Sequence, residues 1–403
     1  MMHANKLKAV SIVFLLVLSV LVIVSLCDAQ THGPKWARKV PKKPADLLDR
    51  LERERAASRL PADFFSTIGD AASPITVYPG GVAFESLQDA FDYCSPDQTG
   101  GGSGATRDYV VVIQAGTTWT GNYTLPNIGI RVIGMGGKFG ATIQGSPGNS
   151  QPVITFAPGA GPSKTHAWLS GLWIMASDGP AIEYVGASSY SSLWLDGCML
   201  DVEGAHSGIE MSGLGYGPDM RMSLSLDYTG VETDGDGIVI DVGEFTEGYF
   251  LNGHTGVSGT AVDIRCAAPL DNDFYFLNWY LFATQAGFRA SNASYFWLNN
   301  CTVSTDGIAL EATGVGHANI DRTETHSGQT HSIVVDATDL QLDYSHVTAG
   351  STSANCLRAL NNSTVNCSYN KFSGSTFANA YLIDGTSSKT GWIYNHHKYT
   401  ALP

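Results

Sequence analysis

Short runs of alternating apolar and polar residues recur along the chain from about residue 165 onward. Each run closes on an apolar residue and a small polar residue, as in Trp194-Leu195-Asp196 and Phe276-Leu277-Asn278, and the polar residue returns at intervals of 21 to 31 residues. Gly-rich turns such as Asp236-Gly237-Ile238 separate the runs. A period of two predicts strands rather than helices. A repeat of this length is typical of one coil of a parallel β-helix, so we predict an all-β solenoid of about ten or more coils.

The recurring polar residues are expected at tight corners between strands. Asn and Asp tolerate left-handed backbone there and bond to local backbone groups. Stacked amides can also bond to the coils above and below. The sequence therefore predicts a structural ladder rather than a catalytic role for these residues: Asp196, Asp227, Asn252, Asn278, Asn299, Asp321 and Asp343.

An apolar run lies near the start of the chain. Lys6 and Lys8 precede it, and it ends at Cys27-Asp28-Ala29. This order predicts a secretory signal peptide within residues 1–29. The alternative is a membrane anchor over residues 9–27, because 19 apolar residues just span a bilayer. Both alternatives predict a protein that is secreted, extracellular or held at the cell surface.

Charge divides the rest of the chain. Residues 35–59 carry nine Lys or Arg against four Asp or Glu, whereas from residue 60 onward 12 basic residues stand against 32 acidic ones. We interpret residues 30–73 as a basic linker with a short helix, and residues 74–403 as the β-helix domain. A formal charge of −14 argues against a nucleic-acid partner, which requires a basic footprint. Self-association through the linker would make a homo-oligomer.

Sequons and cysteines agree with export. Asn-x-Ser/Thr occurs six times, which predicts a glycoprotein where the sites are used: Asn122, Asn292, Asn300, Asn361, Asn362 and Asn366. Six cysteines follow Cys27, and their spacing suggests no zinc site. An even number permits disulfides, but we expect most of these cysteines to be small buried residues.

The start of the predicted domain has a recognisable order. "FESLQDAFDY" is amphipathic at helical spacing and is expected to cover the end of the first coil, and "VVVIQAGTTWTGNYTL" and "RVIGMGGKFGATIQG" supply the first strands. Over about residues 80–145 the chain resembles the pectin-lyase-like superfamily, nearest to its pectinesterase and pectate-lyase types. The resemblance implies a right-handed, single-stranded parallel β-helix that is commonly extracellular and commonly acts on or attaches to polysaccharide. It does not by itself imply catalysis.

The catalytic motifs of these relatives are largely absent. Asp273-Phe274-Tyr275-Phe276-Leu277-Asn278 is similar to the nucleophile strand of pectinesterases, which makes Asp273 a candidate. The Gln-Asp pair expected one coil earlier is replaced by Leu251-Asn252-Gly253-His254. A strand that happens to begin with Asp explains the match more simply.

A polygalacturonase-like set would use Asp234, Asp236 and His254, with Arg265 beyond. Inverting hydrolysis needs an acid and a base about 6.5–9.5 Å apart. However, Asp-Gly is the ordinary turn of this repeat, so these residues are also explained by their repeat position. Pectate-lyase chemistry would add carboxylate-bound Ca²⁺, for which the acidic pairs of the chain supply suitable oxygen ligands. Calcium is therefore the one cofactor that the sequence leaves open. The compatible carboxylate groups are Asp234 with Asp236, Asp241 with Glu244 and Glu247, and Asp271 with Asp273.

Aromatic residues concentrate at 274–282 and 295–297. Alternation turns half of each strand outward, and aromatic rings on neighbouring coils would form a platform for sugar stacking. The candidates are Trp279, Tyr280, Tyr295 and Trp297. Core packing or a protein interface explains the same residues.

Three functions stay open at this point. The leading hypothesis is an exported β-helix protein that engages a polysaccharide or another surface without a complete known catalytic set. The second is a carbohydrate-active enzyme, whether lyase, hydrolase or esterase. The third is a structural or adhesion protein that assembles in the manner of viral tailspikes.

Overall fold

The computed structural model describes residues 74–78, 81–94, 109–137, 139–158, 165–186, 190–213, 221–243, 245–268, 271–376, 379–393 and 395–398. All of them belong to the second of two compact units, Ala71–Pro403. The expected signal peptide or anchor (1–29) and almost all of the expected linker (30–73) lie in the first unit, and both lie outside the described residues. Within the described part of the chain, no helix has the length and apolarity needed to span a membrane.

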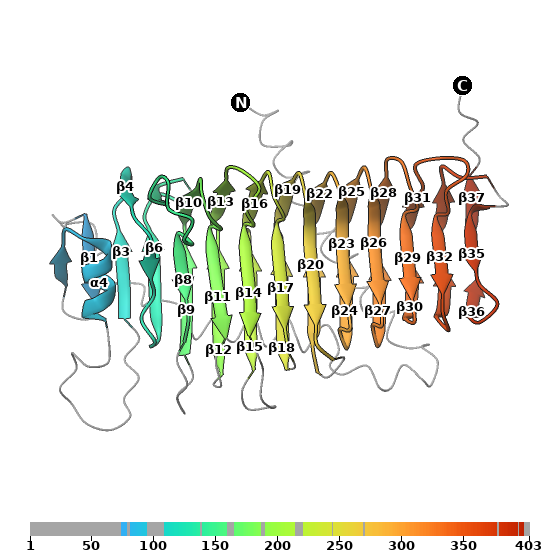
Figure 1. Ribbon diagram of the computed structural model, residues 1–403, viewed down its shortest axis with the longest axis horizontal. Coiled ribbons are helices and arrows are strands. Elements are labelled where there is room, and N and C mark those ends of the chain that lie inside the picture. The colour runs from blue at the N-terminus through green and yellow to red at the C-terminus, as the bar shows by residue number, and fades with distance from the viewer. Residues whose placement is uncertain are drawn as a thin grey trace, which may run out of the picture. The chain divides into compact units, whose positions relative to one another are not determined.

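The described residues form three sheets (Figure 1). Sheet A has the order β2 (Val82–Phe84), β1 (Ile75–Tyr78), β3 (Tyr109–Ile113), β6 (Ile130–Gly134), β9 (Thr165–Ser170), β12 (Ser191–Asp196), β15 (Met222–Asp227), β18 (Thr246–Leu251), β21 (Asp273–Leu277), β24 (Tyr295–Asn299), β27 (His317–Asp321), β30 (Asp339–Asp343), β33 (Thr364–Ser368) and β36 (Ser388–Ile393).

Sheet B runs from β4 (Thr117–Thr120) through β7 (Ala141–Gln144), β10 (Leu172–Ala176), β13 (Met199–Val202), β16 (Gly230–Thr233), β19 (His254–Val257), β22 (Tyr280–Ala283), β25 (Thr302–Thr305), β28 (Glu324–Ser327), β31 (His346–Thr348) and β34 (Lys371–Ser373) to β37 (His396–Lys398). Sheet C runs from β5 (Tyr123–Thr124) through β8 (Ile154–Phe156), β11 (Ile182–Gly186), β14 (Ile209–Gly213), β17 (Ile238–Val242), β20 (Thr260–Cys266), β23 (Ala286–Ser291), β26 (Ile308–Thr313), β29 (Ile333–Asp336) and β32 (Leu357–Leu360) to β35 (Tyr381–Ile383).

Three consecutive strands, one from each sheet, make one coil, and eleven coils of the described residues contribute a strand to every sheet. Successive coils pair in parallel and in register, so that Trp194 lies between Trp168 and Ser225. The ten runs recognised in the sequence are the ten successive strands of sheet A from β9 to β36. The predicted parallel β-helix is confirmed.

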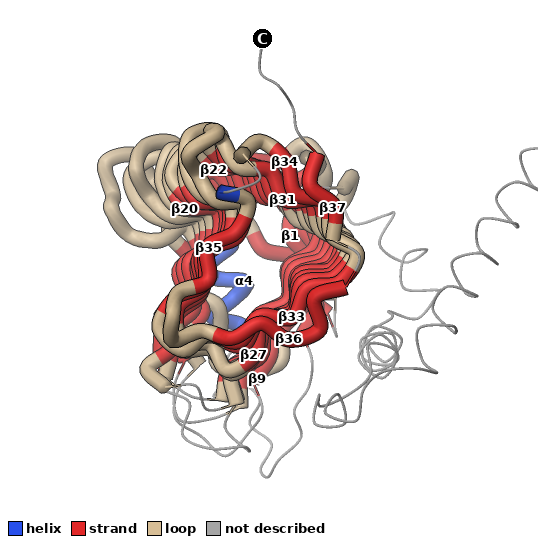
Figure 2. Tube along the Cα trace, turned by 90° about the vertical axis from the view of Figure 1, so that its right-hand side faces the viewer, coloured by secondary structure: helices blue, strands red, loops and turns tan. Residues whose placement is uncertain are grey.

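The three sheets enclose a central space (Figure 2), and the buried, alternate side chains of each strand fill it. At the N-terminal end this space is covered by helix α4 (Leu87–Tyr93), which buries Leu87, Ala90 and Phe91. Ser86 caps the helix, since its hydroxyl accepts a hydrogen bond from the Asp89 backbone N–H (3.3 Å). The predicted capping helix is therefore present at the first coil.

Between sheets A and B, an inward side chain at the corner joins one coil to the next. The Thr323 hydroxyl accepts from the backbone N–H of Cys301 (3.4 Å), the Ser345 hydroxyl accepts from the N–H of Thr323 (3.1 Å), and the Asn370 amide oxygen accepts from the N–H of Ser345 (2.8 Å). These side chains satisfy buried backbone donors where the chain leaves one sheet for another.

The described coils end on β36, β37 and β35, the last strands of the three sheets. In β36, Lys389 occupies the register position of the fully buried Val365. Its Nζ lies 4.3 Å from the ring centre of Tyr381 and 4.5 Å from that of Trp392. A further strand stacked on this edge would bury the charge, so Lys389 hinders end-to-end pairing with another sheet.

We therefore predict that Lys389→Val increases end-to-end self-association relative to the wild-type chain. Removing the inward charge leaves an apolar end with unpaired strand edges, and sedimentation velocity at increasing concentration should show dimers or longer species. Lys371→Val is the control, because this lysine is exposed on the outer face of β34 and its loss changes the net charge equally. Identical sedimentation of both variants would contradict the role of Lys389.

Candidate functional site

The predicted ladder occupies two adjacent positions. Asp196, Asp227, Asn299, Asp321 and Asp343 are the last residues of their strands, whereas Asn252 and Asn278 lie one residue further, at the turn into sheet B. Of these seven residues, Asn252 (φ 52°) and Asn278 (φ 56°) adopt left-handed backbone. In the other five coils the positive φ falls on the following residue: Gly197, Tyr228, Asn300, Arg322 and Tyr344. In those five coils the polar residue ends its strand and faces outward.

The expected bonds between coils are present at both positions. Asn252 Nδ2 donates to Asp227 Oδ1 (3.1 Å), Asn278 Nδ2 donates to Asn252 Oδ1 (2.9 Å), and Asn300 Nδ2 donates to Asn278 Oδ1 (2.7 Å). Asn299 Nδ2 likewise donates to Asp321 Oδ2 (2.9 Å). The ladder residues thus have structural partners on neighbouring coils.

Two carboxylates of the ladder stack on each other, since Asp321 and Asp343 are register partners in β27 and β30. Burial raises the pKa of both, and the charge of Asp343 raises the pKa of Asp321 further. Asp343 Oδ2 accepts a hydrogen bond from Gln341 Nε2 (2.6 Å), which opposes the effect of burial.

Asp343→Asn should stabilise the protein at pH 7. Because the pKa of Asp343 in the folded chain lies above its unfolded value of about 3.9, stability falls as the pH rises through the folded-state pKa. An amide cannot ionise, and it can donate to Asp321 as Asn299 does. We expect a gain of about 0.5–1 kcal/mol at pH 7, the scale of one cross-strand charge pair, which vanishes near pH 3.

Denaturant unfolding between pH 3 and pH 8 measures this effect. Asp384→Asn is the control and should lower the stability at pH 7 rather than raise it. The reason is that hydrogen bonds from Ser387, Asn361 and Thr386 lower the pKa of Asp384. Loss of stability in the Asp343 variant at pH 7 would show that the Gln341 hydrogen bond outweighs the repulsion.

The five catalytic candidates lie on different parts of the coil. Asp273 begins β21 on the outer face of sheet A, His254 begins β19 on sheet B, and Arg265 lies in β20 of sheet C. Asp234 and Asp236 lie in the turn between β16 and β17. The structure does not gather them into one site.

The two turn carboxylates have backbone partners. Asp234 Oδ2 accepts from the N–H of Gly204 in the preceding coil (3.4 Å), and Asp236 Oδ1 accepts from the N–H of Thr260 in the following coil (2.6 Å). The pKa of Arg265 is raised by its hydrogen bond and ion pair with Asp263, and to a smaller extent by Asp241 and Asp236. Asp236 and Arg265 thus lie near each other, but each already interacts with another group: Asp236 with the backbone of Thr260, and Arg265 with Asp263.

Asp273 lies beside an ion-paired cluster on sheet A. The Arg221 guanidinium contacts the carboxylates of Glu247 and Asp271, and Tyr249 donates a hydrogen bond to Glu247 Oε2 (2.6 Å). Burial, and then the charge of Asp273, raise the pKa of Tyr275 on the same strand. The cluster holds three neighbouring coils together.

Aromatic rings on the outer face of sheet A stack on one another from coil to coil. Ring centres lie 5.2 Å apart for Trp168 and Trp194 and 5.5 Å apart for Tyr249 and Tyr275. Tyr295 is only 8 % exposed, with Tyr275 and His317 at 5.6 and 5.7 Å. The ring faces that a sugar would need are covered by neighbours, so Tyr295 was wrongly placed in the platform, and Trp297 is half-buried on the same face.

Trp279 was also wrongly placed in the platform, because its side chain is 0 % exposed. It follows the corner residue Asn278 and points inward, edge-on to Phe250 (5.8 Å) and Phe276 (6.3 Å). Gly253 occupies the equivalent position one coil earlier, where a Cβ atom would lie 2.5 Å from the Trp279 ring. The glycine makes room for the indole inside the coil.

Tyr280 is the one member of the predicted platform that is open to solvent. Tyr280 and Phe282 are 53 % and 46 % exposed on the outer face of β22, with rings at an angle of 8° and centres 6.4 Å apart. Register places Thr302 and Glu324 beside Tyr280 on the next two strands, and Ser304 and His326 beside Phe282.

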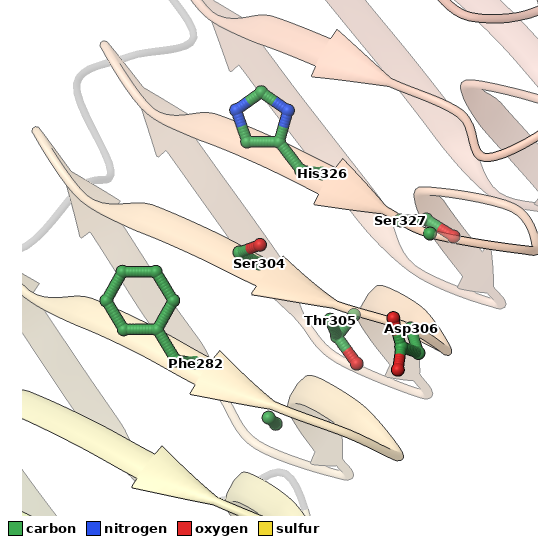
Figure 3. Close-up of a pocket in the computed structure, with 8 residues that line it drawn as sticks. Phe282, Ser304, Thr305, Asp306, His326 and Ser327 are labelled. Atoms are coloured by element: carbon green, nitrogen blue, oxygen red, sulfur yellow. The ribbon is translucent and has the colours of Figure 1, made fainter.

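A pocket of about 280 Å³ opens beside this pair, where sheet B turns toward sheet C. Figure 3 shows Phe282, Ser304 and His326 in line on three successive strands, with Thr305, Asp306 and Ser327 at the strand ends. The turn is held by Thr305, whose hydroxyl accepts from the N–H of Gly307 (3.1 Å) and is 3.3 Å from the Thr284 carbonyl. We call the outer face formed by Tyr280, Phe282, Ser304, Asp306 and His326 the sheet B strip.

Histidines on this face lie near carboxylates or hydroxyls. His326 Nε2 lies 3.5 Å from Glu324 Oε2, His254 Nε2 lies 3.7 Å from Glu232 Oε1, and His346 Nε2 lies 2.9 Å from Ser373 Oγ. The face therefore combines exposed rings with donors and acceptors. No group of three His, Cys, Asp or Glu side chains suited to a metal ion occurs among the described residues, and calcium stays a prediction.

Sequence reasoning found Tyr280 but missed Phe282, Ser304, Asp306 and His326. The signal was available: residues 280 and 282 share a face by alternation, and successive repeats of 22 residues lead from Phe282 to Ser304 and His326. Only the exposed fraction of each ring distinguishes this face from sheet A.

The sequons and cysteines have mixed surroundings. Asn292, Asn300, Asn361 and Asn362 are exposed, while Asn122 and Asn366 are half-buried. Asn122 Nδ2 donates to the carbonyls of Gln151 and Pro152, both at 2.9 Å. The six described cysteines are buried free thiols, and burial raises their pKa.

Comparison with known proteins identifies no family that matches the chain, and no curated protein matches it. Among solved structures, the chain is similar to the A-module of the mannuronan C-5 epimerase AlgE6 from Azotobacter vinelandii. The TM-score is 0.43 and the identity 12 %, over 77 % of this chain and 94 % of the module. At this level the likeness carries no information about activity.

Proposed function

We propose that the protein binds polysaccharide through the sheet B strip. The observation that carries the proposal is the exposed pair Tyr280 and Phe282 beside a polar pocket. Adjacent exposed apolar side chains beside polar groups are a common feature of binding sites, and the faces of aromatic rings suit the C–H faces of sugar rings. Ser304, Asp306 and His326 supply donors and acceptors for hydroxyl groups.

The repeat adds a geometric reason for a polymer. Adjacent coils are about 4.8 Å apart, close to the length of one sugar unit in an extended chain. A polysaccharide that runs along the coils would therefore meet similar positions on β22, β25 and β28. The pocket has a volume of about 280 Å³, close to the volume of about 300 Å³ at the lower end of the range for small-molecule sites. This volume suits one sugar unit of such a chain.

We also infer that the protein is exported and belongs to the pectin-lyase-like superfamily. The support is the order of motifs over residues 80–145 and the apolar run within residues 1–29. Binding rather than turnover is the function we propose, because the catalytic candidates are spread over three sheets and the turn between them.

Tyr280→Ala and Phe282→Ala should each weaken binding of the full chain to a responsive polysaccharide by about tenfold, which corresponds to about 1.4 kcal/mol. Isothermal titration calorimetry on a panel of soluble polysaccharides measures the affinity, and release of reducing ends or unsaturated product is recorded in the same samples. If the chain releases reducing ends or unsaturated product, the proposed binding function is wrong and the protein is an enzyme.

Tyr228→Asn is the matched control for the loss of an exposed ring. Tyr228 is 56 % exposed at a corner with φ 50°, where other coils carry Asn, so its replacement should leave affinity unchanged. The proposal fails if the wild-type chain binds no polymer of the panel, or if the Tyr280 and Phe282 double variant binds as well as the wild type.

A further inference from the structure

We infer that the sheet B strip selects uncharged polysaccharides and excludes polyuronates; this inference rests on the proposed function and names its substrate class. Two exposed carboxylates lie close to the strip. The side chain of Glu232 is 55 % exposed on β16, and that of Glu324 is 58 % exposed on β28. Asp306, also exposed, lines the pocket itself.

The acidic character continues beyond the strip. Asp201 on β13 is the register partner of Glu232 on β16, so the two carboxylates share the outer face on adjacent strands. Burial, and then the charges of Glu232 and Glu203, raise the pKa of Asp201, as expected where negative charges accumulate. From residue 60 onward the chain holds 12 basic and 32 acidic residues, so the surroundings do not offset this local field.

The strip lacks the residue that proteins generally use for carboxylates. Arginine recognises them through paired hydrogen bonds, and none of the strands of sheet B from β16 to β34 contains an arginine. Arg322 lies at the corner before β28, with its Nε 3.8 Å from Asp321 Oδ2. Lys371 on β34 lies four strands from Tyr280.

A polyuronate therefore meets Asp306 and Glu324 with no arginine or lysine on β22, β25 or β28 to offset them. An extended chain that contacts β22, β25 and β28 carries a charge on every sugar, so it cannot place all of them away from Asp306 and Glu324. Like charges brought together across an interface select against a partner even where its shape fits. An uncharged polymer of the same backbone keeps the ring stacking and avoids the repulsion.

The test compares polymers that differ only in charge, with the full chain. The first pair is methyl-esterified polygalacturonate and its de-esterified form, and the second is hydroxyethyl cellulose and a preparation of it oxidised at C6. Affinity of the wild type for the uncharged member should exceed that for the charged member by at least tenfold at low salt. The ratio should shrink in high salt, which screens exposed charges.

Charge-removal variants test whether the strip is responsible. The double variant Glu232→Gln and Glu324→Gln should reduce the ratio to about one third of its wild-type value or less. The matched control is Glu183→Gln with Glu210→Gln, which removes two register-paired carboxylates from the outer face of sheet C and should leave the ratio unchanged.

Equal affinity for both members of a pair would overturn the inference while leaving the proposed function intact. A ratio that falls equally in the control variant would also overturn it, because the selectivity would then come from net charge alone. If neither member of any pair nor any polymer of the panel binds, the proposed function itself fails and the inference is withdrawn with it.

Discussion

The hydrogen bonds that join each coil to the next are the interaction on which the rest of this structure depends. Within the sheets, backbone groups pair in register from one coil to another. At the corners the backbone changes direction, and side chains such as Thr323, Ser345 and Asn370 take over as acceptors for buried N–H groups. An unsatisfied buried donor would cost about 1–3 kcal/mol at each coil. In these coils the corner therefore needs a side chain with an acceptor oxygen.

This pairing determines which residues can form a site. Residues about 22 positions apart in the sequence, such as Phe282, Ser304 and His326, lie on adjacent strands. Residues closer in the sequence, such as His254 and Arg265, lie on different sheets because the chain passes through three sheets in about one repeat. Residues that form a motif along the sequence therefore need not lie together on the surface of a solenoid.

Two outer faces rich in aromatic residues have different consequences in this fold. On sheet A the rings of Tyr249, Tyr275 and Tyr295 stack on one another and are largely buried, so they stabilise neighbouring coils. On sheet B, Tyr280 and Phe282 come from a single strand. The residues beside them are Thr302 and Ser304 on β25 and His254 and Gly256 on β19. Apart from His254 these neighbours are small, so the two rings stay exposed, and this exposure is what makes the sheet B strip the candidate site.

The sequence by itself determined the architecture, because the period of two and the return of a polar residue after 21 to 31 residues are local properties that each coil repeats. It also determined the helix that caps the first coil, through its apolar spacing over Leu87–Tyr93. Only the tertiary structure decided which aromatic residues are exposed. Trp279 and Tyr280 are adjacent in the sequence, which predicts both of them for the platform. In the structure Trp279 fills the space next to Gly253 inside the coil, whereas Tyr280 faces solvent. The physical reason is that exposure depends on the neighbouring coils, whose side chains come from residues more than 20 positions away.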